Sequence, residues 1–190
     1  MEVTFRPLAD ADLGLLADWL GRPHVQAWWR DPLAPAKVVE KYGPRIRGQS
    51  PIEVFVVVLD GIDVGMIQRY RIVEDPELLA GLAKLGFDGS QSAGLDYLLG
   101  DASVVGRGVG TEMVRSFSDR LFADLDGITT IAVTPEAANA ASCRLLEKAG
   151  YRRDVVGLLP SGDDPADADP GAREFALYLL DRPTGSARRD

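Results

Sequence analysis

Three alternating glycines in residues 106–111, Gly-Arg-Gly-Val-Gly-Thr, have the composition of an anion-binding loop. They follow a predicted strand and open a predicted helix. Glycines let the backbone approach a ligand closely, and the unpaired amides of a helix N-terminus carry a partial positive charge that suits a pyrophosphate. A P-loop would require Gly-Lys-Ser/Thr and a Rossmann loop a different third glycine, which argues against nucleoside triphosphate chemistry. The alternative to anion binding is that these glycines only relieve steric crowding in a strand-to-helix turn.

Asp96 is the charged residue whose position most needs a chemical explanation. It stands between Leu95 and Tyr97 in the apolar run 93–99, where the pattern predicts a buried strand. Burying a carboxylate costs free energy unless a partner or a substrate compensates. We therefore interpret Asp96 as a site residue, with a structural ion pair as the alternative.

The elements that must position these residues follow from periodicity and turn signals. Strands are predicted at residues 3–6, 52–59, 64–72, 93–99, 128–133, 152–159 and 175–180. Helices are predicted at 13–20, after the glycine loop as far as 125, and at 139–149, where Gly150 ends the last one. Asp60-Gly61 predicts a tight hairpin turn. The fold class is therefore α/β, a mixed sheet flanked by helices.

Three further segments have weaker signals. Residues 22–49 contain several prolines, so we predict short helices broken at those prolines. Residues 74–92 show no steady period and predict an irregular or partly helical insertion. An acidic loop is predicted at 162–171, and a flexible tail at 183–190 after a single domain over residues 1–182.

Composition and charge narrow the class of protein. The chain has 190 residues, of which 46% are hydrophobic and 26% charged, as expected of a soluble globular protein. No apolar run is long enough to cross a bilayer and no secretory leader pattern is present, so we expect a cytoplasmic protein without a membrane partner. One cysteine and one histidine leave no metal cluster to propose. The net charge of −8 disfavours a nucleic-acid partner and favours a small cationic molecule.

Residues 139–151, Asn-Ala-Ala-Ser-Cys-Arg-Leu-Leu-Glu-Lys-Ala-Gly-Tyr, supply a second motif. Together with the glycine loop they resemble the GNAT acetyltransferase superfamily, whose coenzyme A loop reads Q/R-x-x-G-x-G/A and whose later helix reads N-x-x-(A/S)-x-x-x-Y-E-K-x-G-F/Y. The resemblance implies a GNAT-type, mostly antiparallel sheet and an N-acetyltransferase that uses acetyl-CoA, without a metal. It implies that acetyl-CoA binds at Leu98, Leu99, Val105, Gly106, Arg107, Gly108, Val109, Gly110, Thr111, Asn139 and Ser142.

A narrower resemblance covers nearly the whole chain. The segments 18–20, 22–25, 27–29, 64–70 and 94–99 are similar to those of aminoglycoside 6'-N-acetyltransferases. It implies that Asp96 binds or deprotonates the acceptor amine and that Trp28, Trp29 and Tyr70 contribute to the substrate pocket. The expected acceptor is then a small-molecule amine, with an aminoglycoside and antibiotic resistance as the specific hypothesis. The oligomeric state stays open between monomer and homodimer.

The departures from the family pattern leave alternatives open. Leu146 stands where the family usually keeps a tyrosine that protonates the departing thiolate, so the donor is unassigned among Ser142, Tyr97, Tyr151 and water. Thr134 replaces an aspartate of the aminoglycoside enzymes. The chain also resembles siderophore lysine N-acyltransferases, which carry a histidine in place of Asp96. A protein lysine acyltransferase and a non-catalytic acetyl-CoA-binding protein are the remaining alternatives.

Overall fold

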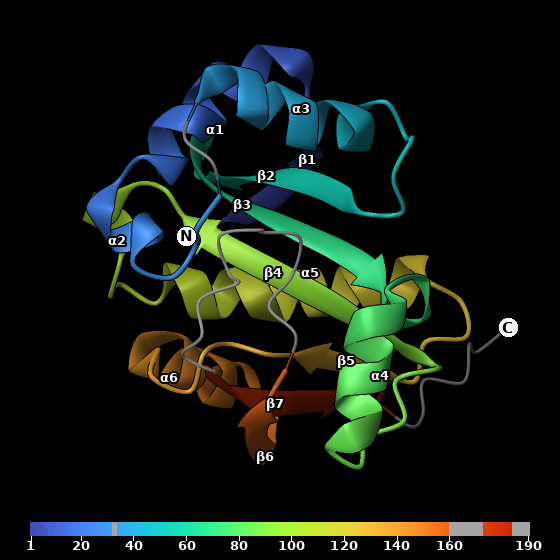
Figure 1. Ribbon diagram of the computed structural model, residues 1–190. Coiled ribbons are helices and arrows are strands. Elements are labelled where there is room, and N and C mark those ends of the chain that lie inside the picture. Colours follow the sequence, from blue (N-terminus) through green and yellow to red (C-terminus); the bar gives the residue numbers. More distant parts are fainter. Residues whose placement is uncertain (32–33, 160–172, 184–190) are drawn as a thin grey trace, which may run out of the picture.

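The computed structural model describes residues 1–31, 34–159 and 173–183. Within these residues the chain builds a sheet of seven strands in the order β1-β2-β3-β4-β5-β7-β6 (Figure 1). The strands are β1 (Val3–Pro7), β2 (Glu53–Leu59), β3 (Ile62–Arg71), β4 (Ser92–Leu99), β5 (Thr130–Val133), β6 (Arg152–Leu158) and β7 (Glu174–Asp181). Neighbouring strands are antiparallel except β4 and β5, which are parallel. The predicted mixed, mostly antiparallel sheet is confirmed.

Helices cover both faces of this sheet. They are α1 (Leu13–Leu20), α2 (Pro23–Gln26), α3 (Pro35–Ile46), α4 (Pro76–Lys84), α5 (Val109–Asp124) and α6 (Ala140–Ala149). Apolar residues of α1–α3 pack with Met66 and Leu98 on one face, whereas those of α5 and α6 pack with Leu95 and Ile131 on the other. Leu82 of α4 packs over β5 and β7 on the face opposite α5, and Figure 1 shows α4 crossing these strands.

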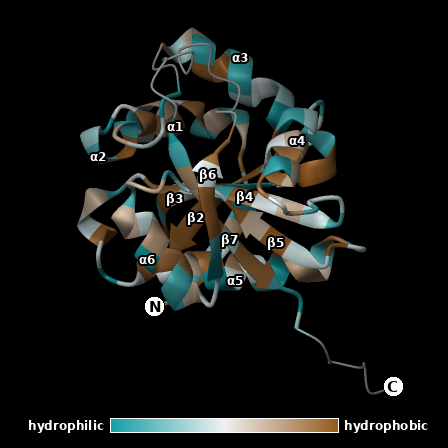
Figure 2. Cartoon of the chain, turned by 60° about the horizontal axis from the view of Figure 1, so that its bottom comes forward, coloured by the Kyte–Doolittle hydropathy of each residue, from teal (hydrophilic) through white to brown (hydrophobic). Residues whose placement is uncertain are grey.

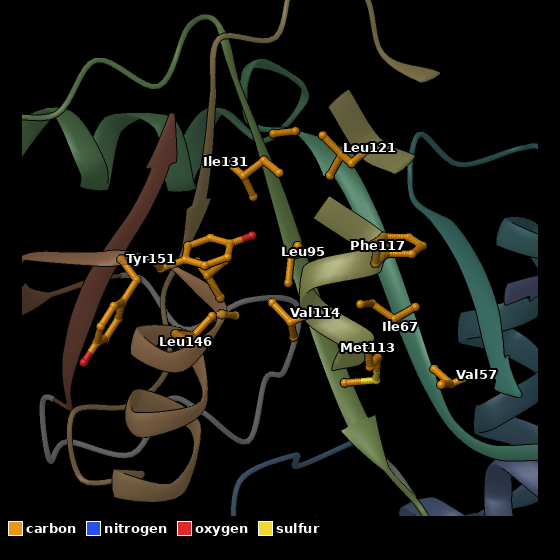
Figure 3. Packing of buried hydrophobic residues seen from close by; sticks show 14 of the residues in the cluster. Val57, Ile67, Leu95, Met113, Val114, Phe117, Leu121, Ile131, Leu146 and Tyr151 are labelled. Carbon is orange, nitrogen blue, oxygen red and sulfur yellow. The ribbon is translucent and has the colours of Figure 1, made fainter. Parts of the chain in front are cut away.

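The interior is apolar where the strands and helices meet. Figure 3 shows Leu95, Val114, Phe117 and Ile131 converging between the sheet and α5. In Figure 2 hydrophobic residues are prominent along the central strands, while the surrounding helices and loops carry both hydrophilic and hydrophobic residues. None of the described helices combines the length and hydrophobicity that a membrane crossing requires.

Local turn and cap signals predicted the structure well. Asp60 and Gly61 both adopt positive φ, 47° and 84°, and close the predicted hairpin between β2 and β3. Gly150 ends α6 in the left-handed conformation, with φ of 101°. In the predicted insertion, Asp75 caps α4 because its carboxylate accepts a hydrogen bond of 2.9 Å from the Leu78 amide.

Three prolines in the N-terminal half start a helix or lie within one, whereas the sequence predicted helices broken at the prolines. Pro23 and Pro35 stand at the first position of α2 and α3, where a missing N–H costs no hydrogen bond. Pro44, however, lies inside α3, so the prediction that each proline breaks a helix is wrong there. Because Pro44 is in the last turn, the loss is confined to one bond near the helix end. The predicted acidic loop at 162–171 and residues 184–190 of the predicted tail lie outside the described residues.

Strands β4 and β5 stop pairing partway along β4. They pair only from Ser92 opposite Thr130 to Gly94 opposite Ala132, whereas β4 stays paired with β3 as far as Leu99. Among the described residues, β4 therefore has no strand partner on its β5 side from Leu95 to Leu99. We call this stretch the open edge of β4. Its backbone groups that face away from β3 must be satisfied by side chains, by water or by a ligand.

Candidate active site

A cavity of about 1270 Å³ adjoins the open edge of β4. Its walls come from α2, the end of α3, the start of α4 and the N-termini of α5 and α6. Most residues predicted for the site line it, namely Trp28, Trp29, Tyr70, Asp96, Leu98, Leu99, Val105, Gly106, Gly108, Gly110, Thr111, Asn139 and Ser142. Two others lie elsewhere: Val109 is buried in the core, and Arg107 is exposed on the loop outside the cavity lining.

The three glycines of the loop are required for different structural reasons. Gly106 and Gly108 adopt positive φ, 78° and 85°, and a Cβ at either would meet no atom within 4 Å. Backbone conformation, not crowding, therefore requires glycine at these two positions. Gly110 is instead crowded, because a Cβ there would come within 2.5 Å of Leu145 Cδ1 on α6. The loop thus leaves open space in front of the first amides of α5, where an anion can bind.

The N-terminal part of α6 forms the adjoining wall. The side chain of Asn139 accepts a hydrogen bond of 3.1 Å from the Ser142 amide, so the helix-capping function expected of any asparagine at this position is present. Arg144 and Lys148 of the same helix also line the cavity. Sequence reasoning did not assign these two cations, although their spacing of four residues places them on one side of the helix. Their positive charges suit an anionic ligand in the cavity.

The backbone of β4 alternates between β3 and the cavity. A Cβ at Gly65 would collide with the Leu98 carbonyl oxygen, so this carbonyl points toward β3. By alternation, the N–H and C=O groups of Leu95, Tyr97 and Leu99 point to the open edge. His24 Nε2 donates a hydrogen bond of 2.9 Å to the Leu99 carbonyl. Of the two β4 residues predicted to bind acetyl-CoA, Leu98 and Leu99, only Leu99 therefore presents its backbone to the cavity.

Asp96 is half-buried in the cavity wall and held by a neighbouring strand. Gln68 Nε2 donates a hydrogen bond of 2.8 Å to Asp96 Oδ2, and Gln68 Oε1 accepts one of 2.8 Å from Arg45 Nη1. Burial raises the pKa of the Asp96 carboxyl, against the opposing effects of the Gln68 hydrogen bond and the charges of Arg45 and Lys41. The result is a carboxylate more basic than an ordinary aspartate, with one oxygen held by Gln68.

Tyr70 lies beside Asp96 on the same face of the sheet. A Cβ at Gly94 would come within 2.5 Å of the Tyr70 ring, so the glycine makes room for the ring to cross β4. Burial, reinforced by the charge of Asp96, keeps the pKa of Tyr70 well above that of a free phenol. Tyr70 is therefore a neutral hydroxyl in this wall.

The two predicted tryptophans differ in exposure. Trp28 leaves 41% of its surface exposed, whereas Trp29 packs against the cluster between α1–α3 and the sheet. Both line the cavity, so Trp28 presents the more accessible aromatic surface to a substrate.

Carboxylates that sequence reasoning missed also line the cavity, and Asp31 and Glu136 are two of them. Asp31 accepts hydrogen bonds from Lys41 Nζ at 2.7 Å and from the Tyr42 hydroxyl at 2.6 Å. Glu136 forms ion pairs with Arg30 and Arg173, and stands two residues after Thr134. No pattern in the sequence links these partners, because up to 106 residues separate them.

On the other face of β4, two of the candidate proton donors meet. The Tyr97 hydroxyl and Ser142 Oγ are hydrogen-bonded at 2.6 Å, and both residues line the cavity. The third candidate, Tyr151, is bonded to Ser118 at 2.7 Å inside the core. Leu146 is fully buried among apolar residues, and Figure 3 shows it near Val114 and Tyr151. No group of residues suited to a metal ion occurs among the described residues.

Comparisons with known proteins agree on one family. The family model described as "Acetyltransferase (GNAT) domain" matches residues 9–156. The chain is 33% identical over 163 residues to aminoglycoside N(6')-acetyltransferase type 1 of Klebsiella pneumoniae, covering 84% of this chain and 79% of that protein. It is 26% identical to the lysine N-acyltransferase MbtK of Mycolicibacterium paratuberculosis, over 93% of this chain and 72% of that one. The crystal structure of aminoglycoside acetyltransferase AAC(6')-Ib with coenzyme A and kanamycin superposes with a TM-score of 0.79 at 30% identity, covering 95% of each chain.

Proposed function

The chain belongs to the GNAT acetyltransferase family, and from this premise we propose that it acetylates an amine of an aminoglycoside, with Asp96 as the residue that binds and deprotonates this amine. As a GNAT N-acetyltransferase it takes the acetyl group from acetyl-CoA and passes it to a small-molecule amine. The aminoglycoside acceptor and the part of each residue belong to the proposal.

The observation that carries the proposal is the placement of Asp96 at the open edge of β4. Its carboxylate is half-buried in the cavity wall, and Gln68 holds Oδ2 at 2.8 Å. An alkylamine has a pKa of about 10 and is mostly protonated at neutral pH, so it must lose a proton before it can attack a thioester. A carboxylate with a raised pKa both attracts the ammonium form and accepts that proton.

The remaining residues of the cavity bind and orient the two substrates. The first amides of α5 with Gly106 and Gly108, together with Arg144 and Lys148, hold the phosphates of acetyl-CoA. The backbone groups of the open edge pair with the amide-bearing arm of acetyl-CoA as a further strand would. An N–H of that edge that faces the acetyl oxygen stabilises the negative charge that develops on it. The aromatic rings of Trp28 and Tyr70 form the part of the cavity wall that contacts the acceptor.

Asp96→Asn tests the base directly, because the amide keeps the size of the side chain but cannot take up a proton. We expect kcat/KM to fall by about 10² to 10⁴ while the Kd of acetyl-CoA stays unchanged. In the wild type, kcat/KM should fall as the pH drops through the raised pKa of Asp96, and the variant should lose this dependence. Asp126→Asn, at an exposed aspartate outside the cavity lining, is the matched control. Wild-type turnover in Asp96→Asn would make Asp96 structural.

A panel of amines tests the acceptor. Coenzyme A release measured with kanamycin, free lysine and a polyamine should be fastest with kanamycin. A preference for lysine would favour the lysine N-acyltransferase alternative, to which the likeness to MbtK points. Binding of acetyl-CoA without turnover of any amine would contradict the proposed activity.

A further inference from the structure

The thiolate that leaves in acetyl transfer needs a proton, and the family's usual donor position does not supply one here. Leu146 occupies that position, has no acidic group, and is fully buried in the core between the sheet and α5. A protein group that protonates this sulfur must instead lie in the cavity wall, near the open edge of β4.

Two consecutive residues of β4 place acidic and basic groups on opposite sides of that edge. Side chains alternate along a strand, so Asp96 points to the face of α1–α4 and Tyr97 to the face of α5 and α6. Tyr97 reaches the N-terminal turn of α6, where its hydroxyl meets Ser142 Oγ at 2.6 Å. A thioester lying along the open edge, in the plane of the sheet, then has Asp96 on one side and the Tyr97 hydroxyl on the other.

We propose that Tyr97 is the proton donor to the departing sulfur and that Ser142 is its positioning residue. The inference rests on the proposed function. As the amine nitrogen bonds to the acetyl carbon, the carbon–sulfur bond breaks and its electron pair stays on sulfur. Asp96 has by then passed the proton of the ammonium form to water, so its carboxylate can take the second proton, which the nitrogen loses as it bonds to carbon. The Tyr97 proton moves to the sulfur. Both residues then return to their starting state by exchange with water.

The hydrogen bonds explain why Tyr97 can release its proton and Tyr151 cannot. Ser118 Oγ donates its only proton to the Val114 carbonyl at 2.7 Å, so the Tyr151 hydroxyl must donate to Ser118. In the Tyr97–Ser142 pair either oxygen can donate. When Ser142 donates, the Tyr97 proton is directed elsewhere, and the same hydrogen bond stabilises the phenolate that remains.

The acidity of the groups favours Tyr97 over Ser142 as the donor itself. A phenol has a pKa of about 10, whereas an aliphatic alcohol is a much weaker acid. Burial raises the pKa of Tyr97 further, so the phenol is fully protonated at neutral pH and available to donate. Ser142 accordingly acts through Tyr97.

The test compares Tyr97→Phe with Tyr151→Phe, which remove the same atom from two tyrosine–serine pairs. The first readout is the acid dissociation constant of the thiol of bound coenzyme A. It is obtained by titrating the absorbance of the thiolate against pH, and the titration requires no acceptor amine. A phenol that donates to the thiolate stabilises it, so Tyr97→Phe should lower this constant by about tenfold. Tyr151→Phe should leave it at the wild-type value.

The second readout is acetyl transfer to the best amine of the panel. Tyr97→Phe should lower the single-turnover rate by about 10² or more, with the Kd of acetyl-CoA unchanged, and Ser142→Ala should lower it less. Fluorotyrosine at position 97, a more acidic phenol, should restore the rate. If Tyr97→Phe changes neither the thiol nor the rate while Asp96→Asn still abolishes transfer, the proposed function stands and the assignment of Tyr97 falls. Equal effects of both phenylalanine variants would also overturn it.

Discussion

Among the residues that the structure describes, two tyrosine–serine pairs have nearly the same geometry in very different surroundings. Tyr97 and Ser142 are 2.6 Å apart at the cavity, and Tyr151 and Ser118 are 2.7 Å apart in the core. Burial raises the pKa of both phenols. Ser118 and Tyr151, however, are 1% and 3% exposed, whereas Ser142 and Tyr97 are only partly buried and line the cavity.

The two pairs have the same chemical groups, so any difference in what they do must come from their surroundings. The core pair is closed, because Ser118 donates to the Val114 carbonyl and accepts from Tyr151, and loss of either hydroxyl should cost stability. The cavity pair has a side open to a ligand, so its removal should cost binding or turnover. The predictions below therefore separate changes at the cavity from changes in the core.

Of three further changes, one at the glycine loop should have the largest effect. Gly108→Val forces a β-branched residue into a positive φ and puts a side chain in front of the α5 amides. We expect the affinity for coenzyme A, measured by calorimetry, to fall by about a hundredfold, as the loss of two good hydrogen bonds would cause. Gly127→Val is the control, because Gly127 also has positive φ and open surroundings but lies outside the cavity lining. Equal loss in both variants would show that backbone strain, not the ligand site, is responsible.

The next effect concerns the core pair. Ser118→Ala removes the acceptor of the Tyr151 hydroxyl deep in the core, and an unsatisfied buried hydroxyl costs about 1 to 3 kcal/mol. The free energy of unfolding, from urea titration, should fall by about 2 kcal/mol with kcat unchanged. Ser142→Ala should cost less stability, because water from the cavity can replace the serine. The distinction between the two pairs fails if Ser118→Ala impairs transfer and leaves stability intact.

The smallest effect is expected at Gln68, which donates a hydrogen bond to the proposed base Asp96. Its hydrogen bond lowers the pKa of Asp96, so Gln68→Leu should raise that pKa further and protonate the base at higher pH. The acidic limb of the pH profile of kcat/KM should move upward, with a loss of about tenfold at a pH just above the wild-type limb. Gln49→Leu on the exposed surface is the control. A uniform loss at all pH values would instead mean that Gln68 only shapes the pocket.

Much of the fold could be predicted because its signals are local. Asp60-Gly61 required a tight turn, Gly150 required a helix end, and alternating apolar residues required strands. The predicted helix break at Pro44 was wrong because a proline in the last turn of a helix costs little stability. The sequence pattern does not mark where that last turn lies.

The candidate site was predictable only in part. Asp96 was identified by the cost of a charge in an apolar strand, and the glycine loop by its match to an anion site. His24 on the Leu99 carbonyl and Arg30 beside Glu136 were not, because these partners are 75 and 106 residues apart. Contacts of such separation depend on how the helices pack on the sheet.

Residue type, alternation and helix caps act over a few residues, so the amino-acid sequence was enough to predict the chemical groups of this enzyme and most of the strands and helices that carry them. The tertiary structure alone decided which groups share the cavity. It parted β4 from β5 after Gly94, put Tyr97 against Ser142, and enclosed Tyr151 and Leu146 in the core. The physical reason is that exposure to a ligand depends on packing between distant segments, and nothing in the local pattern of a tyrosine and a serine distinguishes a closed pair from an open one.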